Sequence, residues 1–355
     1  MMTSVGILGL GMSLPSHVRK NDWWPAEVVD GWAQRRMPMP TGAMETMTAG
    51  MQSVISAMSR QAVDPFQGAV LRHVLTDETL LDLEEAAARI AIERAGIHAE
   101  EIDVVLTCTT PTEYQLTNSA CALHHRLGLP TACFALHTDG AQHAFLLQLT
   151  IAQAMISGGQ ARAALLVQSC GVSQLLDYSD SISPIFGDGA TAVVIGQVRA
   201  GRGILASTHR TDGKHPNTLI ASAPGKSWYQ EGRAVLHMAD PVGMVDILLR
   251  TVDLSKESID GALARSGHQP RDVDVLAMHQ GTPWLRELVQ EHTGLEHAHA
   301  IDTFGLTAHL FGAFVPSNLV AAERAGVLGE DDLVVIAGGG NGMSYGATVV
   351  RWGGA

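Results

Sequence analysis

Gln142 lies where a buried helix is predicted to begin, at a position whose surroundings favour negative charge. The apolar run 145–156 follows it and closes at Gly158-Gly159, a pattern that predicts a helix capped by glycine. The N-terminus of a helix presents unpaired N–H groups and the positive end of the helix dipole, so it suits a thiolate or an oxyanion. A glutamine side chain donates and accepts hydrogen bonds but cannot act as a nucleophile. The sequence therefore predicts a site at residue 142 that works without covalent attack by that residue.

The composition indicates a globular protein with a large core and excludes several classes of partner. The chain has 355 residues, enough for two ordinary domains or one large duplicated one, and 46% are hydrophobic against 17% charged. No apolar stretch approaches the roughly 18 residues that cross a membrane, and segment 5–12 reads as a first strand rather than a signal peptide. The net charge of −13 argues against a nucleic-acid surface. An acidic partner would need a local basic patch, for which the candidates are Arg35-Arg36, Arg210, Lys214 and Lys226.

Cysteine usage indicates a reducing compartment. The chain has no Cys-x-x-Cys spacing and no disulfide framework. No cluster of His, Cys, Asp and Glu has metal-ligand spacing, so no metal site is predicted. We therefore expect a cytoplasmic protein with four free thiols. They are Cys108, Cys121, Cys133 and Cys170.

Two segments of the chain are alike and predict an internal duplication. The segments 91–106 and 262–277 each read as a helix, a glycine cap, a short turn and a buried strand. Asp103 and Asp274 hold equivalent places and lie 171 positions apart (274 − 103). Each strand is followed by Thr-Pro within a few residues and then by a second predicted helix.

A further pair of segments, 165–194 and 333–350, supports the same duplication. Both read as a strand, a loop, a Gly-Ala-Thr turn and another strand. Two halves with matching strand–helix order predict an α/β protein with sheets packed between helices, related by a pseudo-twofold axis. We place the halves at 1–200 and 201–355. Chance likeness between common α/β sequences is the alternative.

Residues 37–66 interrupt this pattern and hold six of the 14 methionines. One interpretation is a helix packed on the body of the protein. The other is a cap over an acyl pocket or a partner-binding helix, since flexible methionines suit irregular apolar ligands. The apolar residues at helical spacing are Met44, Met47, Met51, Val54 and Met58.

Taken together, the motifs resemble those of the β-ketoacyl-ACP synthase III group of the thiolase superfamily. The strongest matches are Ile185-Phe-Gly-Asp-Gly-Ala-Thr-Ala-Val-Val194 and Gly338-Gly-Gly-Asn-Gly-Met-Ser-Tyr-Gly-Ala-Thr-Val-Val-Arg351. Asn118-Ser-Ala-Cys121, Met278-His279-Gln280 and the opening Gly9-Leu-Gly-Met-Ser-Leu-Pro15 also fit. The resemblance covers nearly the whole chain apart from 37–66, and it implies a thiolase-like fold of two duplicated halves in αβαβα layers.

The resemblance also implies a catalytic site, in which this chain departs from the family at two positions. The family's nucleophilic cysteine matches Gln142, and its histidine matches His279. Its asparagine precedes a Val-Pro pair by a fixed distance, which leads here to His309; counting from Gly305 instead would give Leu306. Cys121 matches a structural position, and we expect it in the core.

A site built from Gln142, His279 and His309 can perform only part of the family's reaction. Acyl transfer needs the thiolate, whereas decarboxylation of a malonyl thioester needs hydrogen-bond donors aimed at the thioester oxygen. Two histidine N–H groups can supply that. Ketosynthase-like domains with glutamine for cysteine resemble malonyl decarboxylases, and the amide could mimic an acylated cysteine. The resemblance places the family's oxyanion hole at the residue-142 amide and the loop of Gly340 and Met343.

The family's substrates reach the site on a pantetheine arm. By resemblance Trp32 would stack on the adenine of coenzyme A and Arg35 or Arg36 would meet its phosphates, although Trp32 could equally be a packing residue. An acyl carrier protein is the other donor we expect, and no cofactor is tightly bound. The resemblance further implies a homodimer in which Leu116 reaches the partner's pocket.

Four functions stay open from the sequence. The first is a decarboxylase acting through His279 and His309. The second is an acyltransferase or condensing enzyme whose cysteine was replaced, by nature or by design, with Gln142. The third is a nucleophile-free acyltransferase with His279 as general base, and the fourth is a non-catalytic partner subunit of an active ketosynthase, whose site would be closed. The departures at 37–66, 142 and 309 suggest a specialised, polyketide-type pathway rather than housekeeping fatty-acid synthesis.

Overall fold

The computed structural model describes residues 4–32, 47–227, 229–340 and 342–354. Arg35, Arg36 and Met44 therefore lie outside the described residues. Within the described part, no helix is long and apolar enough to cross a membrane, and no three side chains of His, Cys, Asp or Glu gather in a way that could hold a metal ion.

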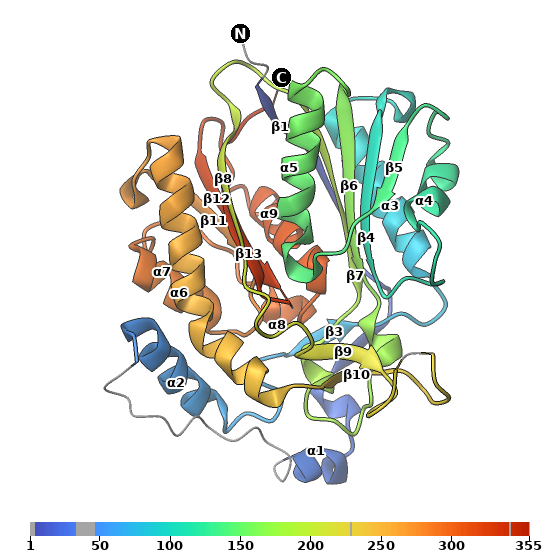
Figure 1. Ribbon diagram of the computed structural model, residues 1–355, viewed down its shortest axis with the longest axis vertical. Helices are drawn as coiled ribbons and strands as arrows, with labels where there is room; N and C mark the ends of the chain where they lie inside the picture. Colours follow the sequence, from blue (N-terminus) through green and yellow to red (C-terminus); the bar gives the residue numbers. More distant parts are fainter. Residues whose placement is uncertain (1–3, 33–46, 228, 341, 355) are drawn as a thin grey trace.

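A five-stranded sheet organises the first half of the chain (Figure 1). Strand β4, next to the edge strand β5, runs parallel to both of its neighbours, β5 and β6, and β7 runs antiparallel to β6 and to β1. In spatial order the strands are β1 (Val5–Ser13), β7 (Gly189–Gln197), β6 (Ala163–Cys170), β4 (Val104–Thr110) and β5 (Phe134–His137).

A four-stranded sheet in the second half repeats this pairing pattern. Strand β11 is parallel to β12, which is antiparallel to β13, which is antiparallel to β8. The counterpart of β5 is reduced to a single parallel bridge between Val275 and His299. In spatial order the strands are β11 (Val275–Met278), β12 (Leu333–Gly340), β13 (Ser344–Arg351) and β8 (Gly203–Thr211).

Matching capping contacts accompany the two sheets. Gly96 and Gly267 both end their helices in the left-handed conformation, at φ 67° and 75°. The Asp103 carboxylate accepts the backbone N–H of Arg162 at 2.7 Å, and the Asp274 carboxylate accepts that of Leu333 at 2.8 Å. The repeat in sequence is therefore a repeat in structure, while the division of the chain at residue 200 stays a prediction.

Helices cover both sheets and also fill the space between them. Apolar side chains of α5 and α9 pack in one core cluster with strands of both sheets, which makes these helices the central layer (Figure 1). Helices α3 and α4 cover the outer face of the first sheet, and α6 and α7 cover that of the second. The predicted αβαβα layering is confirmed. The helices are α3 (Leu80–Ala95), α4 (Ala120–Leu127), α5 (Ala144–Ser157), α6 (Pro241–Ser266), α7 (Leu285–Thr293) and α9 (Phe314–Arg324).

The described part of the methionine-rich segment, from residue 47 on, contains the helix α2 (Ala49–Gln61), which packs on the body of the protein. Thr48 caps the helix by accepting the N–H of Met51. Met47, which the predicted helical run included, therefore lies before the helix begins. Val54 is fully buried against the α6 side of the second sheet, which confirms the packing interpretation. Smaller elements complete the chain: α1 (Ala26–Trp32), α8 (Phe304–Thr307), β2 (Val18–Lys20), β3 (Leu71–His73), β9 (Leu219–Ser222) and β10 (Val235–Met238).

The cysteines follow the sequence prediction except at one position. All four are free thiols, but Cys121 is exposed, so its predicted place in the core is wrong. The reason is the orientation of α4, which buries Ala120, Leu123 and Leu127 and turns residue 121 outward.

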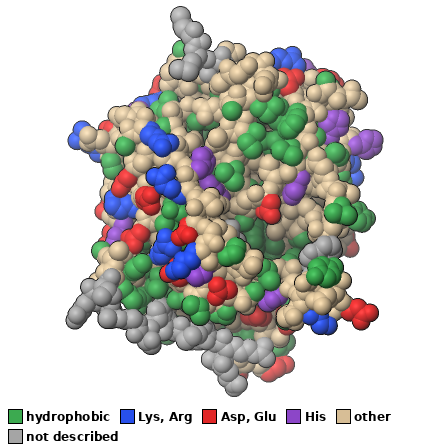
Figure 2. Space-filling view, viewed as in Figure 1, with side chains coloured by type: hydrophobic (Ala, Val, Ile, Leu, Met, Phe, Trp, Pro, Cys, Tyr) green, Lys and Arg blue, Asp and Glu red, His purple; other side chains and the backbone are tan. Residues whose placement is uncertain are grey.

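Two of the candidate basic residues, Arg210 and Lys214, pair with acidic side chains. Figure 2 shows Lys and Arg intermingled with Asp and Glu on the face that α6 occupies in Figure 1. There Arg210 pairs with Glu257 at 3.1 Å, and Lys214 lies 3.5 Å from Asp246. These two cations are therefore paired with acidic side chains and do not form a basic patch for an acidic partner.

Candidate active site

The second sheet places His279 directly after its strand β11. The backbone N–H of His279 donates to Ala337 O of β12 at 2.9 Å, which continues the parallel pairing one residue beyond β11. A Cβ at Gly281 would lie 2.9 Å from the ring, so the glycine leaves room for the imidazole. The backbone of the sheet thus sets the direction of the His279 side chain.

The predicted motif at 185–194 holds His309 in place. The N–H of His309 donates to Ile185 O at 2.8 Å, and its carbonyl accepts the N–H of Gly187 at 3.1 Å, forming a parallel bridge to Phe186. His309 is 4% exposed, whereas Leu306 is 61% exposed. Of the two alternatives at this position, the structure therefore brings His309 to the site and leaves Leu306 on the surface.

The two histidines form one hydrogen-bonded pair. Their Nε2 atoms lie 2.7 Å apart, a distance at which one nitrogen donates and the other accepts. Three phenylalanine rings surround His309 with centroids between 5.2 and 5.7 Å from its own, and the Phe314 ring stacks on it. Phenylalanine rings offer no hydrogen-bond acceptor to an ionised imidazole. The three are Phe186, Phe311 and Phe314.

Burial keeps both imidazoles neutral at physiological pH. It lowers the pKa of His279 from 6.5 to about 4. Burial also lowers the pKa of His309 well below its usual value, and the nearby His279 adds to the shift. The pair therefore offers neutral hydrogen-bond donors rather than a positive charge.

The position of the proton in this pair follows from the unused nitrogen. Nδ1 of His309 is buried and has no hydrogen-bond partner among the described residues. A buried N–H without an acceptor is rarer than a bare acceptor, so we infer that His309 carries its proton on Nε2 and donates to His279. His309 is then the better placed donor for a substrate oxygen that enters between the rings.

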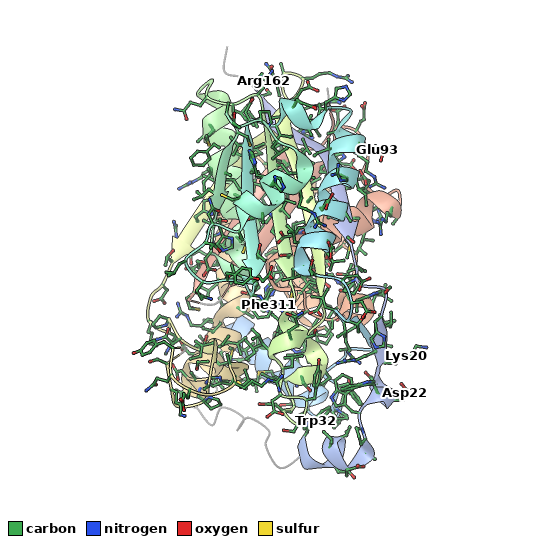
Figure 3. The ribbon with its side chains drawn as sticks, turned by 90° about the vertical axis from the view of Figure 1, so that its right-hand side faces the viewer. Lys20, Asp22, Trp32, Glu93, Arg162 and Phe311 are labelled. Atoms are coloured by element: carbon green, nitrogen blue, oxygen red, sulfur yellow. The ribbon has the colours of Figure 1, made fainter. Side chains whose placement is uncertain are left out.

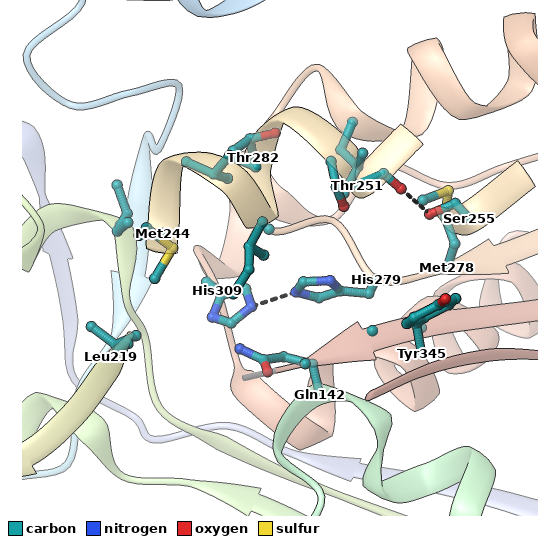
Figure 4. Close-up of a pocket in the computed structure, with 18 of the residues that line it drawn as sticks. Gln142, Leu219, Met244, Thr251, Ser255, Met278, His279, Thr282, His309 and Tyr345 are labelled. Carbon is teal, nitrogen blue, oxygen red and sulfur yellow. Dashed lines mark hydrogen bonds between the residues drawn. The ribbon is translucent and has the colours of Figure 1, made fainter. Parts of the chain in front are cut away.

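Gln142 faces this pair across the pocket (Figure 4). It lies in the 3₁₀ turn Ala141–His143 that precedes α5, one turn before the α-helix proper, and it is 6% exposed. Ala141 has φ +45°, a left-handed conformation that costs about 1–2 kcal/mol for a residue with a Cβ. The strained turn aims residue 142 at the histidines, so the predicted group of three side chains is assembled in the structure.

Gly340 lies directly against Gln142. A Cβ on Gly340 would come within 2.7 Å of Gln142 Oε1 and 2.9 Å of its backbone nitrogen. Met343 lines the same pocket with φ +54°, and its carbonyl accepts the N–H of Asp212 at 2.8 Å. Both predicted loop residues therefore border the site, while the donation of their amides to an oxyanion stays a prediction.

A largely apolar pocket surrounds these residues and extends along α6. None of the described residues that line it is Lys, Arg, Asp or Glu. Helix α6 contributes one face at helical spacing, and Gln61 at the end of α2 also lines the pocket. Sequence reasoning missed this wall, although the apolar spacing within α6 was a readable signal. The α6 residues are Met244, Ile247, Leu248, Thr251, Leu254 and Ser255.

Trp32 does not meet the expectation of a ring that stacks on adenine. It is 2% exposed, its Nε1 donates to Ser179 O at 3.0 Å, and its ring packs edge-on against Trp24 and Phe66. It lies at the same end of the molecule as Lys20 and Asp22 (Figure 3). The packing alternative is correct, because the indole is buried within an aromatic cluster.

Leu116 is fully exposed and adopts φ +70°. Two further apolar side chains are exposed on the edge strand β5, with Phe134 at 47% and Leu136 at 37%. This side of the first sheet therefore presents an unpaired strand edge together with apolar side chains.

Comparison with known proteins identifies relatives along the whole chain. Residues 138–213 match the family model for 3-oxoacyl-[acyl-carrier-protein (ACP)] synthase III, and residues 263–352 match the model for its C-terminal region. The β-ketoacyl-[acyl-carrier-protein] synthase III of Rhodospirillum centenum is 31% identical over 291 residues, which cover 80% of this chain and 88% of that protein. The protein of the same name from Staphylococcus saprophyticus is 28% identical over 355 residues, with 98% and 99% covered.

Solved structures agree with the sequence matches. The 3-oxoacyl-(acyl carrier protein) synthase III of Pseudomonas aeruginosa PAO1 superposes with a TM-score of 0.78 at 26% identity, over 98% of each chain. The priming β-ketosynthase from the R1128 polyketide biosynthetic pathway gives a TM-score of 0.79 at 22% identity, over 99% of this chain and 97% of that one, a likeness of fold.

Proposed function

Because the chain belongs to the β-ketoacyl-[acyl-carrier-protein] synthase III family, we propose that it acts on malonyl-type thioesters and decarboxylates them without a covalent acyl-enzyme. The observation that carries this proposal is the neutral, hydrogen-bonded pair of His279 and His309 facing a residue that cannot be a nucleophile. In such a site, the half-reaction that needs donors remains possible and the one that needs a thiolate does not.

The proposed reaction uses the histidines as donors to the thioester oxygen. The bond between the α-carbon and the carboxylate breaks, its electron pair moves into the thioester, and negative charge collects on the oxygen of the resulting enolate. The Nε2–H of His309 stabilises that oxygen, as does His279 when its Nε2 is protonated. Each well-aimed donor contributes on the order of 3 kcal/mol to lowering the barrier. The α-carbon then takes a proton from solvent, and the products are CO₂ and an acetyl-type thioester.

The pocket lining favours loss of the carboxylate. Its described residues include no cation that could pair with a carboxylate. An ion held without a partner in apolar surroundings is destabilised, whereas neutral CO₂ is not. The lining therefore supports decarboxylation over simple storage of the malonyl group.

Two alternatives are less well supported. A general base works best with a pKa near the operating pH, and the pKa of His279 is lowered to about 4, which weakens the nucleophile-free acyltransferase. A non-catalytic subunit was expected to have a closed site, whereas a connected pocket here reaches Gln142, His279 and His309. The third alternative, an acyltransferase whose cysteine was replaced, predicts the same site with Gln142 and differs only in supposing that residue 142 was once a cysteine. We propose that Gln142 fills the place of an acylated cysteine.

The substrate carrier and assembly form part of the same proposal. With Trp32 buried, the donor we favour is the phosphopantetheine arm of an acyl carrier protein, with coenzyme A thioesters as the alternative. We also propose a homodimer formed along β5, because an unpaired strand edge with exposed Phe134 and Leu136 readily pairs with another copy. A specialised, polyketide-type pathway accords with a site that departs from the condensing enzymes.

The experiment is incubation with malonyl-CoA and with malonyl-loaded carrier protein, followed by mass spectrometry of the acetyl thioester. We expect conversion that falls strongly in His279→Ala and His309→Ala. Matched controls are His297→Ala, at an exposed histidine, and Leu306→Ala, on the surface three residues from His309. Absence of conversion by the unmodified protein on both carriers would refute decarboxylation.

A further inference from the structure

A second pair of histidines lies next to the site but outside the pocket lining. Nε2 of His143 is 3.1 Å from Nδ1 of His209, and Nε2 of His209 is 2.8 Å from Oγ1 of Thr150. The Thr150 hydroxyl in turn lies 3.2 Å from the carbonyl of Leu146, one turn earlier in α5. The chain runs from His143, which is 1% exposed, to Thr150 on the surface.

The direction of donation along this series of hydrogen bonds can be deduced from which atoms can donate and which can accept. In the first order, Thr150 donates to Leu146 O, His209 donates from Nε2 to Thr150, and His143 donates from Nε2 to Nδ1 of His209. This order makes three hydrogen bonds and leaves Nδ1 of His143 as an acceptor without a donor. If the order is reversed, only two bonds form and His143 keeps a buried N–H without an acceptor, since its Nδ1 has no partner among the described residues. Buried N–H groups without acceptors are rare, so the first order is favoured.

These hydrogen bonds link the start of α5 to a position further along the same helix through a strand of the second sheet. His143 stands in the 3₁₀ turn that begins the helix, Thr150 lies about two turns further on, and His209 belongs to β8 at the edge of the second sheet. Strand β13 has Gly346 at the crossing, where a Cβ would come within 2.8 Å of His143 Nε2 and 3.0 Å of His209 Nδ1. The backbone of the second sheet thus leaves space for the two rings to meet.

The 3₁₀ turn Ala141–His143, at the buried end of these hydrogen bonds, is strained. Ala141 has φ +45°, and Gln142 follows it immediately. Such a conformation persists only where neighbouring contacts enforce it. His143 follows Gln142 directly, and its side chain makes a hydrogen-bonded contact from this turn to His209 of the second sheet.

We propose that His143, His209 and Thr150 are positioning residues, a relay of hydrogen bonds from the surface that holds the strained turn and thereby aims residue 142 into the pocket. This inference rests on the proposed function only for the role of residue 142 in the reaction. The hydrogen-bond relay itself does not depend on that function. None of the three side chains belongs to the pocket lining, so their effect reaches the substrate through the turn.

The relay is tested first without any reaction. Nitrogen-15 spectra of the histidine rings separate protonated from unprotonated nitrogens. We expect His143 and His209 both to be protonated on Nε2 and unprotonated on Nδ1 in the full-length protein at neutral pH, assigned with His143→Gln and His209→Gln. A His209 ring protonated on Nδ1 would overturn the relay.

Positioning is tested with a thiol introduced by Gln142→Cys, whose alkylation by iodoacetamide is followed by peptide mass spectrometry. The exposed Cys121 serves as the internal reference. Adding Thr150→Val or His209→Leu should lower labelling at position 142 relative to Cys121 by about fivefold, the change expected from one lost hydrogen bond. Thr150→Ser should restore it, and Thr131→Val, at another exposed threonine, should not change it.

Unchanged labelling in both Thr150→Val and His209→Leu would overturn the positioning role. Thr150 is exposed, so its substitution tests the relay without removing core packing. Labelling does not require decarboxylation. A protein that labels as expected but does not release CO₂ would therefore refute the proposed function and leave the relay standing.

Discussion

His279 and His309 meet through their Nε2 atoms at 2.7 Å although one follows a strand of the second sheet and the other is held by the 185–187 segment. At that distance only one proton lies between the two rings. The pair therefore functions as a unit, and loss of either member changes the protonation and the aim of the other.

The first prediction concerns the coupling of this pair. Each single substitution, His279→Ala and His309→Ala, should lower the decarboxylation rate by about 100-fold to 1000-fold, the usual effect of losing one donor to a developing oxyanion. The double variant should fall little further, because the residues act together. The measurement is a double-mutant cycle on initial rates. Fully multiplicative losses would show that the two rings work independently.

The second prediction concerns pH. The pKa of His279 is lowered by burial, so between pH 6.5 and about 4 the unfolded chain binds a proton that the folded chain does not. Stability should therefore fall as the pH is lowered through this window, by up to about 3 kcal/mol from this residue. Urea unfolding at several pH values should show a smaller decline in His279→Phe than in the parent or in His297→Phe. The rate of decarboxylation should show no inflection near pH 6.5.

The third prediction concerns residue 142. A thiol introduced by Gln142→Cys lies at the start of α5, where the helix end favours a thiolate, and should form a covalent adduct with acetyl-CoA. Intact-mass measurement detects the adduct, and Gln142→Ala should give none. Burial raises the pKa of Cys108 to about 12 and raises that of Cys170 well above its usual value, so neither competes. Failure of the thiol to react would favour a site that no longer binds acyl carriers productively.

The fourth prediction concerns the contact between Gly340 and Gln142. The Cβ in Gly340→Ala would collide with the Gln142 side chain and with its backbone nitrogen, so the rate should drop by at least about tenfold, since small displacements of catalytic groups are costly. Gly213→Ala, which has open space around its Cβ, is the matched control. Adding Gln142→Ala to Gly340→Ala relieves only the side-chain collision. Complete recovery in that double variant would show that the backbone contact has no role.

The fifth prediction concerns assembly. Phe134→Glu places a charge on the exposed edge strand β5 and should weaken the proposed dimer, because a charge at a pairing edge opposes its apolar contact. Val63→Glu changes a valine that is more exposed, at 82%, and lies away from that edge, and it should leave the assembly unchanged. Sedimentation velocity across a range of concentrations measures both. A parent protein that stays monomeric at high concentration would remove the dimer from the proposal.

The positions of the three candidate catalytic residues were available from motif spacing, but their surroundings were not. The phenylalanine rings around His309 come from positions 186, 311 and 314, and nothing in the spacing of those residues indicates that they share one histidine. The prediction that Cys121 lies in the core and the expectation that Trp32 stacks on adenine were wrong for a related reason. Side-chain type does not reveal which face of α4 points to solvent, or that an aromatic cluster encloses an indole.

The sequence by itself determined the layered duplicated fold, because helix caps, buried strands and glycine turns are local patterns repeated at matching places in both halves. It also determined that residue 142 is not a nucleophile, since that depends only on the chemistry of an amide. Only the tertiary structure decided that His309 rather than Leu306 enters the site, that the two histidines remain neutral with one proton between their Nε2 atoms, and that His143 is tied to His209 and Thr150. These properties depend on burial and on distances between segments remote in sequence, which are set by how the two sheets pack around α5 and α9.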